Sequence, residues 1–237
     1  MSQYEVLDKE KHRQLRIKTG HGAAQGDAVK YVMTYPMEFR DIQSCYPILF
    51  TKDPNTGGFF AVAVLGFEAD QNLFLQDDGW DASYIPVVVQ RQPFLIATGK
   101  EGDNETPVVS VDLDHPRVSH AEGEALFDVE GSSTEFLKQK IALLDKLHRG
   151  LQHSRGFINT LLEHELLEQI TLDITFNDGS KTSVQNYYSI AEEQLYQLKG
   201  EILESLNQAG YLQPVFMAVA SLSRMRDIIE RRNRLRA

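Results

Sequence analysis

The sequence predicts an α+β protein with a strand-rich N-terminal half, mostly an antiparallel sheet, and a helix-rich C-terminal half that contains a β-hairpin. Three observations support this class. Residues 46–97 hold the densest set of β-branched and aromatic residues with turn signals between them. After Gly131 the apolar residues change to helical spacing, and Asp178-Gly179 later joins two alternating runs. We expect a single domain over residues 1–237, with a subdivision near 129–134.

The first 45 residues predict short elements separated by turns. The loop over Gly20–Asp27 is rich in Gly and Ala. Proline at position 47 disfavours helix in the preceding residue and so ends the element before it. The pattern predicts strands at His12–Lys18 and Val29–Thr34, and a short helix over Met37–Cys45.

Residues 46–97 predict a hairpin followed by further strands. The turn DPNTGG combines Asp, Pro, Asn and Gly in turn-forming positions. Phe59–Leu65 is almost entirely apolar, which is typical of a central strand covered on both faces. The segment Ile85–Gln90 fits either a helix or a strand. Strands are predicted at Pro47–Thr51, Phe59–Phe67, Asn72–Leu75 and Pro93–Ala97.

Thr98–Pro107 is polar and predicts a surface excursion before a strand at Val108–Leu113. A capping box formed by Ser132 and Glu135 then predicts the start of a helix. A second helix is predicted over Phe157–Leu167, and glycines at 150 and 156 leave its join to the first helix undecided.

The last third predicts a hairpin followed by helices. Ile170–Phe176 alternates in polarity and pairs with Lys181–Tyr187 across the Asp-Gly turn. Ser189 and Glu192 form a second capping box. Helices are predicted from there to Gly200, over Glu201–Gln208, and over Pro214–Asn233, where a stripe of apolar residues faces the body.

Composition restricts the function classes. The chain has 237 residues, 42% hydrophobic content and a net charge of -10. The net charge opposes non-specific binding to nucleic acid.

The two most apolar segments are too short to span a bilayer, and the charged N-terminus has no signal-peptide pattern, so we expect a soluble cytoplasmic protein. Cys45 is the sole cysteine, which excludes an internal disulfide and is interpreted as a structural thiol. The arginine-rich segment 224–236 is interpreted as a solvated helical face, with partner docking as the alternative.

A series of short motifs resembles the bacterial SapC family over nearly the whole chain and in the same order. The motifs are Met37-Glu38-Phe39, YPILF at 46–50, VLGF at 64–67, NLF at 72–74, GW at 79–80, YIP at 84–86, R-x-PF at 91–94, EGEALFD at 122–128 and AGYL…SL at 209–222. The chain departs from the family at Gln90-Arg91-Gln92, where a dibasic site is common.

The resemblance implies a protein associated with a surface layer or an uptake system, encoded near outer-membrane receptors, with no established catalytic residues to transfer. The sequence itself lacks a G-x-S-x-G elbow, a P-loop and a dinucleotide fingerprint. We therefore expect no cofactor, and the chain is interpreted as a non-enzyme.

One alternative is a metal-dependent enzyme or accessory component. Carboxylates and imidazoles at the end of a strand can supply ligands for iron. The residues that could do so are Asp112, Asp114, His115 and His120. Their spacing matches no strong metal motif, and Asp-His-Pro is also a good turn.

The leading hypothesis is a binding or scaffold protein that recognises a protein or peptide partner. Aromatic rings combined with a guanidinium and an amide offer apolar area, cation–π contact and directional hydrogen bonds. The residues predicted to form this site are Tyr46, Asn72, Trp80, Tyr84 and Arg91. The other readings are a surface-layer structural protein and self-association into homo-oligomers.

Overall fold

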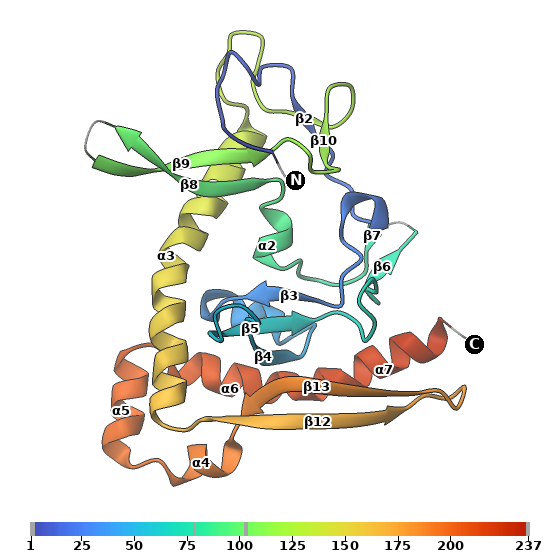
Figure 1. Cartoon of the computed structure of the whole chain (residues 1–237), viewed down its shortest axis with the longest axis vertical. Coiled ribbons are helices and arrows are strands. Elements are labelled where there is room, and N and C mark those ends of the chain that lie inside the picture. The colour runs from blue at the N-terminus through green and yellow to red at the C-terminus, as the bar shows by residue number, and fades with distance from the viewer. Residues whose placement is uncertain (1–2, 78, 102–103, 236–237) are drawn as a thin grey trace. The chain divides into compact units, whose positions relative to one another are not determined.

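A computed structural model describes residues 3–77, 79–101 and 104–235. Antiparallel sheets and helices confirm the predicted α+β class (Figure 1). The chain forms two compact units that interleave along the sequence: unit 1 holds residues 1–27, 76–79 and 87–149, and unit 2 holds the rest. The chain last passes between the units at residues 149 and 150. The prediction of one domain with a subdivision near 129–134 stays a prediction.

Unit 2 is built on a five-stranded sheet with the strand order β12-β13-β4-β5-β3. All of its neighbouring strands pair antiparallel. β5 lies between β3 and β4 and its second half is fully buried, as its apolar run predicts. The strands are β3 (Tyr31–Thr34), β4 (Ile48–Lys52), β5 (Phe59–Val64), β12 (Leu167–Thr175) and β13 (Lys181–Ile190).

The predicted hairpin of residues 46–67 is present, and its turn chemistry explains the register. The Asp53 carboxylate accepts hydrogen bonds from the backbone N–H groups of Asn55 and Thr56, both at 2.8 Å. Gly57 follows at a φ of 71°, a left-handed conformation that favours glycine. The strands that leave this turn pair Lys52 with Phe59 and continue to Ile48 and Ala63.

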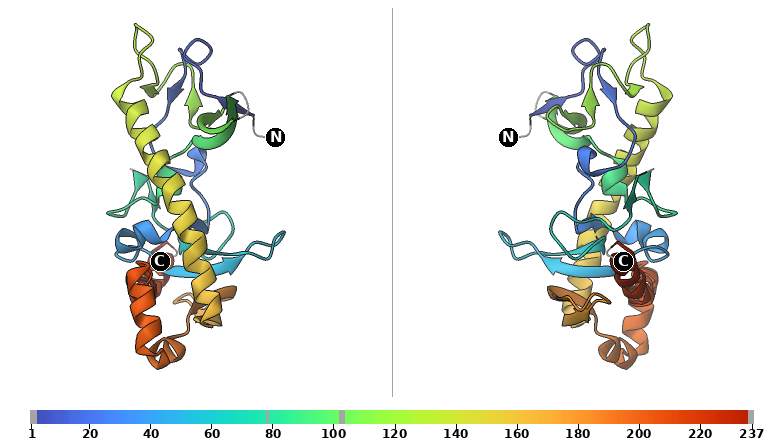
Figure 2. Two further views of the ribbon diagram at one scale, coloured as in Figure 1. Left: turned by 90° about the vertical axis from the view of Figure 1, so that its left-hand side faces the viewer. Right: turned by 90° about the vertical axis from the view of Figure 1, so that its right-hand side faces the viewer.

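Helix α3 runs without a break over Glu135–Glu163, so the prediction of a separate helix at Phe157–Leu167 is wrong (Figure 2). The two glycines permit close packing rather than a break. A Cβ at Gly156 would lie 2.2 Å from the Tyr211 hydroxyl oxygen, and one at Gly150 would lie 2.4 Å from Met37 Sδ. The helix starts one residue after Thr134, whose hydroxyl accepts the Leu137 N–H at 3.3 Å, so the predicted cap at Ser132 is also wrong.

The C-terminal segments form four helices: α4 (Glu192–Gln197), α5 (Gly200–Gln208), α6 (Leu212–Ser221) and α7 (Met225–Arg234). Ser189 lies inside β13, and Ala191 precedes α4 without a side-chain cap, which corrects the second predicted capping box. The single helix predicted over Pro214–Asn233 is divided by the 3-10 turn η3 (Leu222–Arg224).

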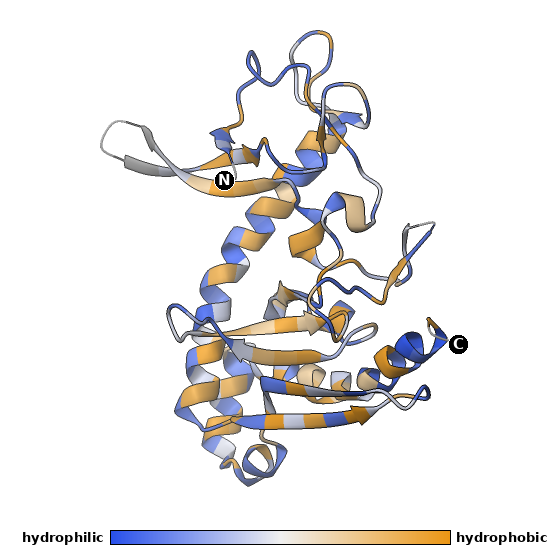
Figure 3. Cartoon of the chain, turned by 45° about the vertical axis from the view of Figure 1, so that its right-hand side comes forward, coloured by the Kyte–Doolittle hydropathy of each residue, from blue (hydrophilic) through white to orange (hydrophobic). Residues whose placement is uncertain are grey.

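The core of unit 2 contains a cluster of aromatic rings among its aliphatic side chains. Phe157 of α3 packs edge-on against Phe39, with ring centroids 5.9 Å apart, and also contacts Phe50 of β4. Figure 3 shows the hydropathy alternating along β12. One face of this strand packs against the rest of unit 2, and the other face is exposed to solvent. Burying each of these rings stabilises the fold by roughly 1.5–3 kcal/mol.

Unit 1 has its own smaller core and two three-stranded sheets, ordered β1-β9-β8 and β10-β2-β11. The strands are β1 (Tyr4–Val6), β2 (Arg16–Ile17), β8 (Phe94–Glu101), β9 (Asn104–Asp112), β10 (Val118–Ser119) and β11 (Glu124–Ala125). The segment Thr98–Pro107, predicted as a surface excursion, belongs to a hairpin in which β8 and β9 continue as a paired ladder to Glu101 and Asn104.

Short elements complete the chain. The undecided segment Ile85–Gln90 contains helix α2 (Val87–Gln90), and the predicted strand His12–Lys18 is ordered as a strand only at β2. The helix predicted at Met37–Cys45 is the 3-10 turn η2 (Pro36–Glu38) followed by α1 (Phe39–Ile42).

The strand predicted at Asn72–Leu75 is wrong, because only β6 (Leu75–Gln76) is extended, and it pairs with β7 (Gly79–Trp80). The predicted loop over Gly20–Asp27 contains the 3-10 turn η1 (Ala23–Gln25).

Candidate functional site

Three of the five predicted ligand-binding residues form one hydrogen-bonded network in unit 2. The Trp80 indole N–H donates to the Tyr46 hydroxyl at 2.7 Å, and that hydroxyl donates to the carbonyl of Tyr84 at 2.5 Å. The Tyr46 side chain is completely buried, and burial raises the pKa of its hydroxyl. The three aromatic residues therefore bind one another and fix the segment 80–86 on the core.

The buried carboxylate of Glu38, which was not among the predicted site residues, extends this network. Glu38 is 2% exposed, and it accepts hydrogen bonds from the hydroxyls of Thr34 and Tyr84, both at 2.8 Å. Burial and the neighbouring Glu38 charge raise the pKa of the Tyr84 hydroxyl. The network therefore links the end of β3, η2 and the segment 80–86.

The other two predicted residues each make hydrogen bonds with nearby backbone groups. The Asn72 side-chain oxygen accepts the Phe74 N–H at 3.0 Å, which stabilises a turn. Arg91 belongs to unit 1, where its guanidinium donates to the Phe94 carbonyl at 2.7 Å. Ligand binding by the five residues stays a prediction, and the contacts described here are local and structural.

The candidate metal ligands form turns in unit 1. The Asp112 carboxylate accepts the Asp114 N–H at 3.2 Å, and His115 Nδ1 accepts the Arg117 N–H at 3.2 Å. Burial lowers the pKa of the His115 imidazole, with Arg117 acting in the same direction. His120 is exposed. Within residues 3–77, 79–101 and 104–235, no group of three His, Cys, Asp or Glu side chains is placed to hold a metal ion.

Unit 1 also contains a buried ion pair that sequence reasoning missed. Arg117 donates to both carboxylate oxygens of Asp27 at 2.8 Å, and the Gly22 N–H donates to the same carboxylate at 3.0 Å. Burial alone would raise the pKa of Asp27, but the hydrogen bonds from His21 and Gly22 and the Arg117 charge outweigh it and lower that pKa. Arg117 and Asp27 are 90 residues apart, so sequence spacing could not pair them.

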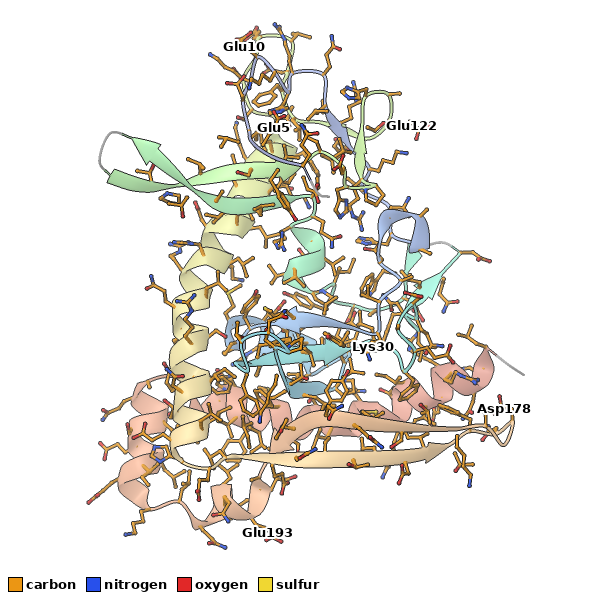
Figure 4. All side chains as sticks on the ribbon, viewed as in Figure 1. Glu5, Glu10, Lys30, Glu122, Asp178 and Glu193 are labelled. Carbon is orange, nitrogen blue, oxygen red and sulfur yellow. The ribbon has the colours of Figure 1, made fainter. Side chains whose placement is uncertain are left out.

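Two further sequence features have structural roles. Arg231 forms an ion pair with Asp81 at 2.7 Å. Arg232 lies 3.5 Å from Asp178, which Figure 4 labels at the tip of the β12–β13 hairpin, so part of the arginine-rich tail fixes α7 to the rest of unit 2. The Cys45 thiol lies 3.1 Å from the Ser83 hydroxyl. Burial opposes ionisation of Cys45, but hydrogen bonds from Ser44 and Ser83 lower its pKa.

An open groove in unit 2 offers a better binding surface than the predicted constellation. It has a volume of about 490 Å³ and lies between residues 151–162 of α3 and the sheet, at the end of β3 and the β4–β5 turn. In the described part of the chain nine large hydrophobic side chains are exposed, and three of them line this groove: Met33 (38%), Leu151 (39%) and Leu162 (43%). Its interior is completed by Phe59 and Ile158.

The groove is basic although the chain is acidic. Lys52 and Arg155 line it, and none of its described lining residues is an Asp or a Glu. The Lys52 ammonium lies 4.8 Å from the centroid of the Phe59 ring and 5.2 Å from that of Tyr188. Among the described residues neither cation makes an ion pair. The sequence signal for this groove was weak, because Met33, Leu151 and Leu162 each fit a helix or strand core pattern.

Comparisons with known proteins identify the family. The family model described as SapC matches residues 7–228, so the chain belongs to the SapC family. No curated protein and no solved structure matches the chain. No helix among the described residues is long and apolar enough to cross a membrane.

Proposed function

We propose that this SapC family protein is a non-enzymatic binding protein, and that the groove beside α3 binds an apolar segment of a protein partner that carries acidic residues. The observation that supports the proposal is the convergence of three exposed apolar side chains on one hollow. Contiguous exposed apolar surface is unfavourable in water unless a partner covers it. A groove of this kind suits a short peptide segment with apolar anchors.

Charge complementarity selects the partner. Lys52 and Arg155 repel a basic segment and attract an acidic one, and the described residues that line the groove include no Asp or Glu. The net charge of -10 repels acidic partners from the rest of the surface, so this groove is a local exception. The free thiol of Cys45 fits a reducing compartment, and we place the binding event in the cytoplasm.

The test is a selection of displayed twelve-residue random peptides against the whole chain, followed by fluorescence anisotropy with the enriched peptides. We expect enrichment of peptides that combine apolar residues with Asp or Glu. Leu151→Asp and Leu162→Asp should each weaken binding about tenfold or more, because each places a carboxylate in the apolar wall. Tyr196→Asp is the matched control, since Tyr196 is 74% exposed in the same unit and outside the groove.

The charge contribution is measured separately. Lys52→Gln and Arg155→Gln should weaken binding of the acidic peptides several-fold and reduce its dependence on salt. If no peptide is enriched, or if Leu151→Asp and Tyr196→Asp behave alike, the groove is not the binding site. If basic peptides are enriched instead, the assignment of an acidic partner is wrong.

A further inference from the structure

A second cavity in unit 2, separate from the groove, has the features of a small-molecule site. Its volume is about 370 Å³, and it lies between η2 and α1 on one side and α3 and α6 on the other. This volume is within the usual range of roughly 300–1,000 Å³ for ligand pockets. No residue that the groove proposal uses lines this cavity, so the inference is independent of that proposal.

The floor of the cavity is apolar and adaptable. Phe39 is fully buried, and the half-buried thioethers of Met37 and Met217 face the same cavity from different elements. Methionine has a flexible, polarisable side chain that fits around apolar groups of various shapes. The floor therefore suits an unbranched aliphatic or thioether side chain.

Two glycines line the cavity. Gly150 lies within α3, where a glycine is less favourable than an alanine. A Cβ at this position would lie 2.4 Å from Met37 Sδ, so alanine would displace the thioether that lines the floor. Gly210 lines the cavity at a φ of 74°, a conformation that disfavours any side chain.

The rim carries a positive and a negative charge side by side. Arg40 and Asp41 are consecutive residues of α1, both are exposed, and both line the cavity. Among the described residues neither side chain has an ion-pair partner. Consecutive side chains of an α-helix leave it about 100° apart, so Arg40 and Asp41 present their opposite charges at two separate points of the rim rather than as a facing pair. His153 and Gln213 add polar groups to the same rim.

We propose that this cavity binds a free α-amino acid with an unbranched apolar side chain. Arg40 donates to the carboxylate, since its guanidinium can form two parallel hydrogen bonds with that group. Asp41 accepts from the ammonium, and the ligand side chain lies on the floor between Met37 and Met217. Both charges of the ligand are required, because each one neutralises one charge of the rim.

The experiment is isothermal titration of the whole chain with L-methionine and L-norleucine, with N-acetyl-L-methionine and L-methioninamide as single-charge probes. The expected result is saturable binding of both amino acids and a loss of about tenfold or more for each single-charge probe. Arg40→Gln should abolish the preference for the free carboxylate, and Asp41→Asn the preference for the free ammonium. Arg226→Gln, an exposed arginine outside the cavity, is the control and should change nothing.

The outcomes that overturn the inference are equally definite. If neither amino acid binds, the cavity is not an amino-acid site. If the acetylated and amidated probes bind as tightly as L-methionine, the cavity binds apolar groups only, and recognition of the zwitterion is wrong. These ligand comparisons use the wild-type chain, so they decide the matter even if a variant folds poorly.

Discussion

The two units each bury a carboxylate, and they satisfy it in different ways. In unit 1 the Asp27 carboxylate faces the Arg117 guanidinium, which donates to both of its oxygens at 2.8 Å. In unit 2 the Glu38 carboxylate accepts from the hydroxyls of Thr34 and Tyr84, also at 2.8 Å. The distances are equal, but the Arg117 donor carries a full positive charge, whereas the Thr34 and Tyr84 hydroxyls are neutral donors.

This difference has energetic consequences. Removing a charged partner leaves an uncompensated buried ion, whereas removing a neutral donor leaves one unsatisfied acceptor. Unit 1 has the smaller apolar core, so it depends more on its ion pair. Unit 2 has many buried aromatic rings, and its carboxylate network positions the segment 80–86 on a core that is already extensive.

The largest predicted effect is the loss of the ion pair in unit 1. Arg117→Ala should destabilise unit 1 by about 3–5 kcal/mol, because it leaves Asp27 charged and buried without its guanidinium. Hydrogen exchange resolved by peptide should show lost protection in unit 1 before unit 2. The matched control is Lys18→Ala, which removes an exposed ion pair with Glu122 and should cost less than about 1 kcal/mol.

A second comparison would sharpen this result. If the double variant Arg117→Met with Asp27→Leu regains most of the stability, the cost in Arg117→Ala comes from the unpaired charge. If Arg117→Ala is no worse than Lys18→Ala, the ion pair does not support unit 1, and the contrast between the units fails.

A smaller effect is expected in unit 2 from Tyr84→Phe. The change removes the hydroxyl that donates to Glu38 and should cost about 1–3 kcal/mol. Urea unfolding followed by tryptophan fluorescence measures it directly, since Trp80 is the sole tryptophan and belongs to the same network. Tyr196→Phe, at a residue that is 74% exposed, is the control and should remain within about 0.5 kcal/mol of wild type.

The energetic coupling between the Thr34 and Tyr84 hydroxyls, which donate to the two oxygens of Glu38, can be measured with a double-mutant cycle. The cycle compares Thr34→Val, Tyr84→Phe and the double variant with wild type. A coupling energy near zero would mean that Glu38 does not join the two hydroxyls energetically, and unit 2 would then resemble a simple apolar core.

The fold was predictable where local chemistry decides it. The DPNTGG turn and the Asp178-Gly179 turn carry their conformation in their own residues, and both hairpins form as expected. Gly156 shows the opposite case, because its role depends on Tyr211, which lies 55 residues away and whose hydroxyl occupies the place of a Cβ. Sequence alone presents that glycine only as a poor helix former.

The candidate sites show the same limit more strongly. Tyr46, Trp80 and Tyr84 were selected for residue type, and the structure does bring them together, but with their polar atoms directed to one another. The groove is lined by residues of β3, the β4–β5 hairpin and α3, and the cavity by residues of η2, α1, α3 and α6. Which side chains line each site therefore depends on tertiary packing. Lys52 and Arg155 form no ion pair with any residue that the structure describes, and this can be recognised only when their neighbours are known.

The smallest predicted effects concern pH. Acid should destabilise unit 1 first, and alkali should destabilise unit 2 first. The folded pKa of Asp27 is below its unfolded value of 3.8, so its contribution to stability is present above that value and is lost as pH falls through the folded pKa. We expect unit 1 to lose hydrogen-exchange protection first in acid. Asp27→Asn should remove this acid dependence, and an unchanged profile in that variant would contradict the assignment.

Alkali should act first on unit 2. Burial raises the pKa of Tyr187 to about 12, from 10.0, and it also raises those of Tyr46 and Tyr84. A raised pKa means that the folded state retains the proton, so these residues contribute stability below pH 10.0 that is lost as pH rises through the folded values. Tyrosinate absorbance and Trp80 fluorescence should therefore change together on alkaline titration. If Tyr187→Phe leaves the alkaline midpoint unchanged, Tyr187 does not contribute, and the transition belongs to the Tyr46–Tyr84 network that holds the segment 80–86.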